Sequence, residues 1–168
     1  MGREDKMYNK CCELLKQRGV ELSDIAELIY FLQGGYYPEL SDEKVYVALE
    51  SVLRKREVQH AILTGISLDI AAEEHRMIDK DLEGILLRDE GLFGVDEVLG
   101  FGICNLYGSI ALTSFGYIDK LKPGIVGKLN EKGSQCNTFL DDIVGAIAAT
   151  SASKIAHNLS DNNVEKQK

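Results

Sequence analysis

The sequence contains no tryptophan and only two prolines, Pro38 and Pro123, among 168 residues. Because proline ends or kinks a helix, its scarcity favours long helices throughout the chain. The length suffices for one domain that buries a core without disulfide or zinc support. A hydrophobic share of 45% with 27% charged residues is typical of a folded protein and excludes a disordered chain.

A basic cluster large enough to form a nucleic-acid-binding face is also missing. The formal net charge is −8, whereas a protein that binds nucleic acid has to neutralise phosphates with Lys and Arg. We therefore expect no nucleic-acid partner. The same charge disfavours tight adsorption to an anionic membrane.

The cysteines lack the spacing of a zinc site, and the N-terminus lacks the apolar stretch of a signal peptide. No CxxC pair is present, and no histidine stands near a cysteine at a zinc-ligand interval; the cysteines are Cys11, Cys12, Cys104 and Cys136. We expect reduced thiols and a cytoplasmic protein, with a disulfide framework as the alternative.

Periodic apolar residues predict an all-α fold. Residues 5–35 are expected to form two N-terminal helices, the second capped by Ser23, and Ser41 is expected to cap the next helix. Gly65 interrupts a later helical pattern as a boundary, a kink or a close packing point. Residues 1–160 are predicted to form a single helical domain, followed by a disordered tail over residues 161–168.

The segment from Val98 to Ile118 contains no charged residue over 21 positions, a length that spans a bilayer. Its glycines, Asn105 and hydroxyl residues lower its hydrophobicity below that of a typical membrane span. Small residues recur on one face of this segment and would let other helices approach closely. We expect a compact multi-helix bundle in which a buried central helix, about residues 97–118, is surrounded by the others. A transmembrane helix is the alternative.

Two segments repeat the pattern apolar, acid, acid, apolar, apolar, glycine, in VDEVLG at 95–100 and LDDIVG at 140–145. The glycine one turn after the acids permits close contact between helices. If the helices cross there, the carboxylates of the two pairs meet; the pairs are Asp96 with Glu97 and Asp141 with Asp142. Such carboxylates repel one another unless a cation compensates, and oxygen ligands favour Mg²⁺ or Mn²⁺ over zinc. The alternative is that the acids only cap helices.

Between the two pairs lies DKLKPG at 119–124. Lysines at the mouth of an acidic metal site are suited to phosphate, which the carboxylates alone would repel. Pro123 biases Lys122 toward extended backbone and so predicts the end of a helix there. The alternative role for these lysines is a favourable interaction with the C-terminal end of the helix dipole.

The combination of GVDEVLG, YIDKLKPG and FLDDIVGAIAA, over about residues 60–158, resembles the phosphatidylglycerophosphatase A family, whose members are Mg²⁺-dependent lipid phosphatases. The sequence is most similar to the Gram-positive branch that includes low temperature requirement C proteins. The resemblance implies metal binding by Asp96, Glu97, Asp141 and Asp142. It also implies catalytic roles for Glu97, Asp119 and Asp142, and phosphate binding by Lys120 and Lys122.

The resemblance further implies hydrolysis of a phosphomonoester, in the family the conversion of phosphatidylglycerophosphate to phosphatidylglycerol. Membrane-embedded members carry a GTVGS-type motif where this chain has LTGISLDIAAEE at 63–74. We expect a homo-oligomer, a dimer or a tetramer, with peripheral contact to the inner face of the cell membrane. The alternatives are a phosphatase for a soluble phosphoester and a non-catalytic helical homo-oligomer with a regulatory or lipid-related role.

Overall fold

The computed structural model describes residues 2–131 and 133–165, and these residues form nine helices and no strand. The predicted all-α fold is therefore confirmed for this part of the chain. The helices are α1 (Arg3–Gln17), α2 (Leu22–Gln33), α3 (Asp42–Leu53), α4 (Arg56–Glu73), α5 (Lys80–Arg88), α6 (Val95–Cys104), α7 (Ser109–Leu121), α8 (Gly124–Leu129) and α9 (Leu140–Glu165).

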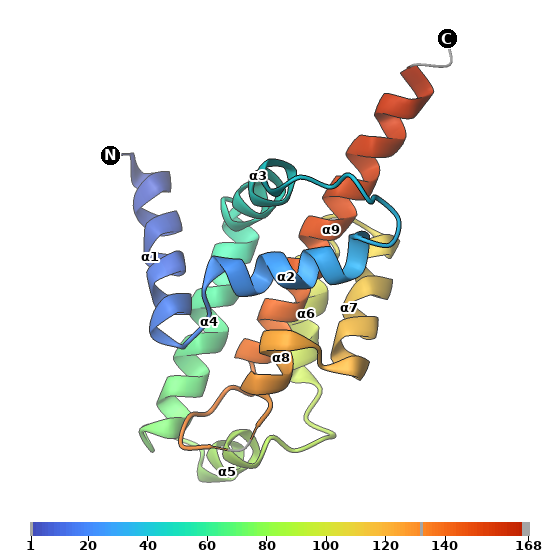
Figure 1. The fold of residues 1–168 in the computed structure, drawn as a ribbon. Coiled ribbons are helices and arrows are strands. Elements are labelled where there is room, and N and C mark those ends of the chain that lie inside the picture. Colours follow the sequence, from blue (N-terminus) through green and yellow to red (C-terminus); the bar gives the residue numbers. More distant parts are fainter. Residues whose placement is uncertain (1, 132, 166–168) are drawn as a thin grey trace.

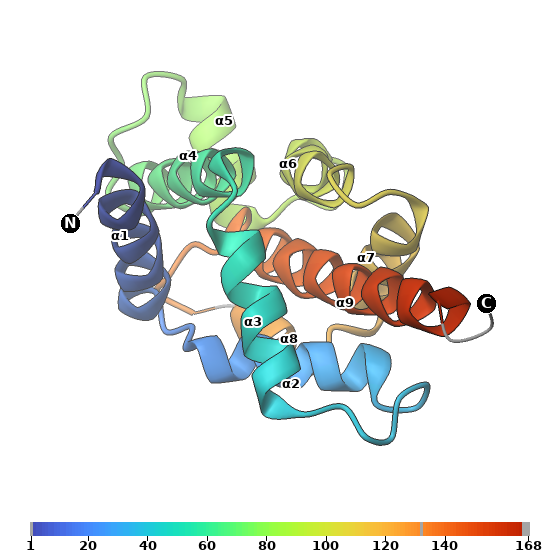
Figure 2. The same cartoon turned by 90° about the horizontal axis from the view of Figure 1, so that it is seen from above.

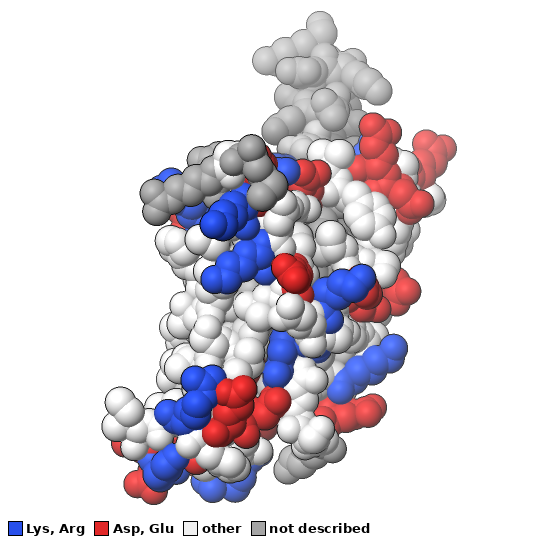
Figure 3. All heavy atoms as spheres, turned by 90° about the vertical axis from the view of Figure 1, so that its left-hand side faces the viewer, with Lys and Arg blue, Asp and Glu red and all other residues white. Residues whose placement is uncertain are grey.

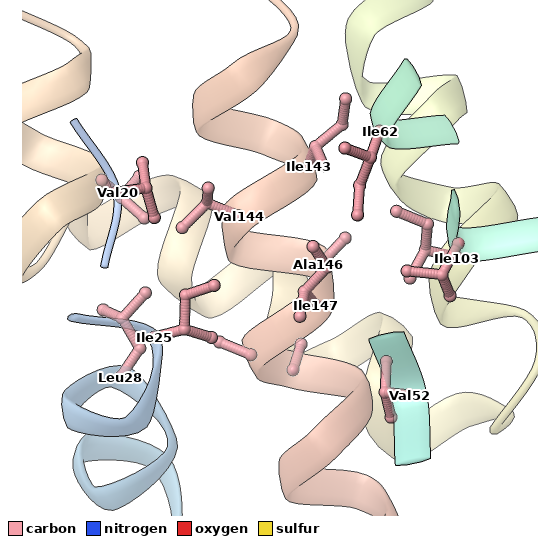
Figure 4. Packing of buried hydrophobic residues seen from close by; sticks show 14 of the residues in the cluster. Val20, Ile25, Leu28, Val52, Ile62, Ile103, Ile143, Val144, Ala146 and Ile147 are labelled. Atoms are coloured by element: carbon pink, nitrogen blue, oxygen red, sulfur yellow. The ribbon is translucent and has the colours of Figure 1, made fainter. Parts of the chain in front are cut away.

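Helix α9 runs through the middle of the molecule (Figures 1 and 2) and contacts α2, α3, α4, α6, α7 and α8. Its side chains are buried on every side from Leu140 to Ser153. In Figure 4, Val144 faces Ile25 of α2, whereas Ile147 lies on the side of Ile103 of α6. Because most side chains of α9 are small, neighbouring helices pack close to its backbone all round.

The structure differs from the sequence prediction in which helix is central. The predicted helix over residues 97–118 is two helices, α6 and α7, separated at Asn105–Gly108. Gly108 has a φ of 79°, which no helical residue adopts and which glycine tolerates best. Both helices are partly exposed, and α9 takes the buried position instead. No helix in the described part of the chain is long and apolar enough to span a membrane.

The N-terminal helices form as predicted, although the cap of α2 is different. Glu21, not Ser23, caps α2, and its side chain forms a capping box with Asp24. Ser41 caps α3 as expected and accepts a hydrogen bond from the Lys44 N–H. Gly65 is a close packing point within α4, because a Cβ there would lie 2.9 Å from Cβ of Phe139.

The C-terminal tail predicted for residues 161–168 overlaps the end of α9, which continues to Glu165. Residues 166–168 lie outside the described residues, and their disorder stays a prediction. On the side of the molecule that carries α1, Lys and Arg are interspersed with Asp and Glu (Figure 3). That face therefore presents charges of both signs and not a basic surface.

Candidate active site

Four helix ends meet at one cavity of about 140 Å³. Helices α5 and α7 end there, and helices α6 and α9 begin there. The cavity is lined by both predicted acidic pairs and by two residues of the predicted lysine segment; these are Asp96, Glu97, Asp119, Lys122, Asp141 and Asp142. The two pairs therefore share one site, as the repeated pattern predicts.

The glycines of the repeated pattern bring the ends of α6, α7 and α9 together by packing against α7. A Cβ at Gly100 would lie 2.7 Å from Cζ of Phe115, and a Cβ at Gly145 would lie 3.2 Å from Cγ2 of Ile118. Real Cβ atoms do not come as close to another heavy atom as 2.7 Å. A residue larger than glycine at position 100 would therefore prevent the present close approach of α6 to α7. The predicted close contact is present, and α7 is the partner that both acidic helices share.

Lys122 forms an ion pair with two of the carboxylates. Its Nζ lies 2.8 Å from Oδ1 of Asp119 and 2.9 Å from Oδ2 of Asp141. Burial alone would lower the pKa of Lys122, but Asp141 and Asp119 outweigh burial and raise that pKa. The ammonium group is therefore charged and serves as an internal counterion for the acidic cavity.

Asp141 and Asp142 are the most buried acids of the cavity, 5% and 4% exposed. Burial raises the pKa of Asp141 to about 6, although Lys122 opposes the shift. Burial, together with the neighbouring Asp141 charge, raises the pKa of Asp142 to about 8. Within the described residues no group donates a hydrogen bond to the Asp142 carboxylate. One lysine thus leaves negative charge in the cavity uncompensated.

Asp96 and Glu97 lie at a more open side of the same cavity and are partly buried. Oδ1 of Asp96 accepts a hydrogen bond from the Glu97 N–H at 3.0 Å. Burial raises the pKa of Asp96, and burial together with Asp96 and Asp119 raises the pKa of Glu97. The carboxylates of both acidic pairs therefore hold their protons more tightly than they would in water.

Comparison with known proteins identifies the family to which this arrangement belongs. The sequence model of phosphatidylglycerophosphatase A matches residues 16–157, which is most of the chain. The chain belongs to the phosphatidylglycerophosphatase A family. The resemblance predicted from the acidic and lysine motifs is thus confirmed, and it extends into the N-terminal helices.

Similar members of the family include proteins of Bacillus subtilis and Listeria monocytogenes. The uncharacterized protein YutG of Bacillus subtilis is 54% identical over 153 residues, which cover 90% of this chain and 92% of YutG. The crystal structure of the low temperature requirement C protein of Listeria monocytogenes has a TM-score of 0.88 and 54% identity, covering 92% of this chain and 97% of that chain. The YpjQ structure of Bacillus subtilis has a TM-score of 0.90 and 43% identity, covering 95% and 99%. The fold is therefore that of these family members.

Sequence reasoning missed Asp89, which lines the cavity next to the family's acidic motifs. Asp89 ends α5 in the left-handed conformation, with a φ of 49°, and its charge raises the pKa of Asp96 and Asp141. The signal in the sequence is its position directly before Glu90-Gly91, because a glycine commonly follows the end of a helix. Asp and Asn tolerate this backbone conformation better than most residues do.

The two predicted phosphate-binding lysines have different positions. Lys122 lines the cavity, whereas Lys120 is exposed on the last turn of α7 and does not line it. Lys122 ends α7 as predicted, but its backbone is left-handed, with a φ of 47°, and not extended. This conformation is sparsely populated for lysine, and strained backbone of this kind is concentrated at functional sites in proteins.

The oxygen-only donor set of the cavity fits a hard divalent cation such as Mg²⁺ or Mn²⁺. Negative charge exceeds positive charge there, and the Asp142 carboxylate accepts no hydrogen bond from the described residues. In the described part of the chain, however, no three His, Cys, Asp or Glu side chains are arranged as a ready-made metal site. Nζ of Lys122 lies between two of the acids and provides the positive charge in this arrangement.

Proposed function

We propose that the protein is a divalent-metal-dependent phosphatase that hydrolyses a phosphomonoester, with phosphatidylglycerophosphate as the substrate that family membership favours. The observation that carries this proposal is the meeting of both acidic pairs, Asp119 and Lys122 at one small cavity. A phosphoryl group needs positive charge around its oxygens and a base for the attacking water. The residues of the cavity are of the types that provide both.

In this proposal Asp96, Asp141 and Asp142 hold Mg²⁺ or Mn²⁺. The metal would supply charge that offsets the phosphoryl oxygens and would lower the pKa of a bound water. Asp142 is suited to hold the ion because its buried carboxylate has no hydrogen-bond donor among the described residues. A doubly charged ion would compensate the charge that Lys122 leaves unbalanced.

Glu97 either binds the metal as well or acts as the general base. Its raised pKa and its partly exposed position suit a group that accepts a proton from water at the cavity mouth. In the reaction the oxygen of that water forms a bond to phosphorus while the bond to the ester oxygen breaks. The leaving oxygen receives a proton, which Glu97 can return after taking it from the attacking water.

The lysines and Asp119 have roles around the phosphate. Lys122 is placed to bind a phosphate oxygen by a charge-assisted hydrogen bond. Asp119, 2.8 Å from Nζ of Lys122, holds that side chain at the cavity. Lys120 is exposed beside it and would contact the outer part of the phosphate-bearing group.

The test is phosphate release by the purified protein with Mg²⁺, from phosphatidylglycerophosphate in detergent micelles and from glycerol 3-phosphate. We expect release from the lipid and a loss of at least about 100-fold in Asp142→Asn, since removal of a ligand costs at least as much as removal of its supporting partners. Asp81→Asn is the matched control, because Asp81 lies exposed in the first turn of α5 and should leave the rate unchanged.

Release from glycerol 3-phosphate alone would select the alternative of a phosphatase for a soluble phosphoester. No release from either substrate, or an Asp142→Asn variant as active as the parent, would contradict a phosphatase that uses this cavity. Circular dichroism of each variant establishes that the fold is retained.

The second candidate function is a non-catalytic homo-oligomer, a dimer or a tetramer, and apolar side chains on the outer face of α6 favour it. Val95, Val98 and Phe101 are 50%, 62% and 45% exposed. Exposed apolar side chains that lie next to one another on a surface are typical of protein or membrane contact sites. The same face would suit peripheral contact of a cytoplasmic protein with the inner face of the cell membrane. Gel filtration with and without Mg²⁺ tests this candidate: a stable oligomer that ignores metal, combined with no phosphate release, would support it.

A further inference from the structure

One face of α4 contacts the segment that leads into α9. Gly65, Asp69 and Glu73 are spaced four residues apart and so lie along one side of the helix. All three contact the stretch from Cys136 to Ile143, which contains the start of α9. The acidic pair Asp141-Asp142 belongs to that stretch.

Asp69 provides the N-terminal cap of α9 from another helix. It is fully buried, and its Oδ1 accepts a hydrogen bond from the Phe139 N–H at 3.0 Å. Its Oδ2 accepts from the Leu140 N–H, also at 3.0 Å. Phe139 stands directly before α9 and has no side-chain oxygen, so it cannot cap the helix itself. The helix takes its cap from α4, about 70 positions away in the sequence.

Glu73 and Arg18 hold the same segment one step earlier. Oε2 of Glu73 accepts hydrogen bonds from the Cys136 N–H and from Nη2 of Arg18, both at 2.9 Å. The same Nη2 donates to the Cys136 carbonyl at 2.6 Å. Arg18 is itself buried and follows α1, so the N-terminal helix also takes part in fixing the segment.

Gly65 fixes how closely the two helices approach. A Cβ at this position would lie 2.3 Å from Cδ1 of Ile143 and 2.9 Å from Cβ of Phe139. The backbone of α4 is therefore in direct contact with the first turn of α9. Together with the hydrogen bonds to Asp69, this contact leaves α9 little freedom to slide or rotate at its N-terminus.

We propose that Asp69 is a positioning residue for the acidic site: it fixes the start of α9 against α4 and so sets where Asp141 and Asp142 enter the cavity. This inference rests on the proposed metal-dependent function. A cap from a residue within α9 would satisfy the same N–H groups but would move with the helix. A cap from α4 ties the helix to the rest of the fold, and metal ligands must be held to a fraction of an ångström.

The test is the affinity for Mn²⁺, measured by isothermal titration on the full chain, together with the melting temperature of each variant. Asp69→Asn keeps the size of the side chain but presents an NH₂ group to one of the two backbone donors. We expect a lower melting temperature and Mn²⁺ binding weakened by about 10-fold or more, the range for residues that orient metal ligands.

Asp79→Asn is the matched control. Asp79 caps α5 with the same chemistry, since its Oδ1 accepts from the Asp81 and Leu82 N–H groups at 3.0 and 2.9 Å. The start of α5 does not line the cavity, so this variant should melt earlier and bind Mn²⁺ like the parent. A role in stability alone would make Asp69→Asn behave in the same way, and that result would overturn the proposal.

If Asp69→Asn does not fold, Asp69→Glu replaces it, because Glu keeps both acceptor oxygens and is longer by one methylene. A folded Asp69→Glu protein with weakened Mn²⁺ binding supports the positioning role, and one with the affinity of the parent overturns it. Absence of Mn²⁺ binding in the parent overturns the proposed function and this inference together. Parent binding with no change in either Asp69 variant overturns the inference alone.

Discussion

The two acidic pairs of the cavity follow the same sequence pattern but have different surroundings. Asp141 and Asp142 open the most buried helix of the fold, and they are almost inaccessible to solvent. Asp96 and Glu97 open a helix on the outside of the bundle and are only partly buried. We propose a division of roles from this difference, in which the buried pair would hold an ion in a fixed place and the outer pair would complete the site on the side open to water and substrate.

The buried pair is also the one whose preceding segment is held by more hydrogen bonds from the rest of the fold. Asp69 and Glu73 of α4 hold the segment before Asp141 by hydrogen bonds from three backbone N–H groups. Helix α6, which carries Asp96, begins after Gly94. Gly94 has a left-handed backbone and no side chain, so no side-chain oxygen caps this helix. A short motif therefore determines which residues reach the cavity, and the contacts of the segment before it with the rest of the fold determine how rigidly they are held.

The largest expected effect separates the two pairs by metal affinity. We expect Asp142→Asn to weaken Mn²⁺ binding by at least about 100-fold and Asp96→Asn to weaken it by about 10-fold, because the outer ligand can be replaced by water. Isothermal titration of both variants measures the difference. Equal losses, or a greater loss in Asp96→Asn, would show that burial does not distinguish the pairs.

The pH dependence of stability is the next test. Burial raises the pKa of Asp142 to about 8, of Asp69 to about 7 and of Asp141 to about 6, whereas carboxyls in the unfolded chain titrate near about 4. Between these values the folded protein binds more protons than the unfolded chain. The stabilisation from these groups is therefore complete below about pH 4 and is lost as the pH rises to about 8.

We accordingly expect the melting temperature of the metal-free protein to fall across this range more steeply than that of Asp142→Asn, which lacks one of the shifted groups. Mn²⁺ should raise the melting temperature more at pH 8 than at pH 5, because ligands bind the ion deprotonated. Parallel pH profiles of the melting temperature for parent and variant would show that Asp142 does not contribute to the pH dependence of stability.

The smallest expected effects test the two pattern glycines. Gly100→Ala should destabilise the protein by about 1–3 kcal/mol, because its Cβ would meet the buried Phe115 ring. Gly145→Ala should be close to neutral, since its contact of 3.2 Å is less severe and Ala gains about 1 kcal/mol in helix propensity.

Gly102→Ala is the matched control for the glycine series. Gly102 lies in α6, and no atom would lie within 4 Å of a Cβ there, so we expect it to stabilise by up to about 1 kcal/mol. Urea denaturation of the three variants gives the free energies of unfolding. A Gly100→Ala protein as stable as Gly102→Ala would show that α6 does not depend on close approach to α7.

The meeting of the acidic pairs was predictable because the information is local. In each motif the acids stand one turn before a glycine, so a helix contact at the glycine brings the acids to the same place. The central helix was not predictable from the absence of charge. Residues 98–118 are uncharged but divided at Gly108, whereas α9 is buried because its residues are small.

Asp69 and Asp89 could not be assigned from the sequence for a different reason. The role of Asp69 depends on the N–H groups of Phe139 and Leu140, which no pattern around residue 69 indicates. Asp89 reaches the cavity because the backbone turns left-handed at the end of α5. Both roles are defined by partners far away in the sequence, and only the fold reveals them.

The most direct test of the metal site is a crystal structure of the protein grown with Mn²⁺, with anomalous diffraction recorded to locate the ion. We predict an anomalous peak in the cavity, bonded to carboxylate oxygens from both acidic pairs at about 2.1–2.2 Å, close to the distances of comparable divalent ions. Absence of a peak at saturating Mn²⁺, or a peak bound only outside this cavity, would contradict the account.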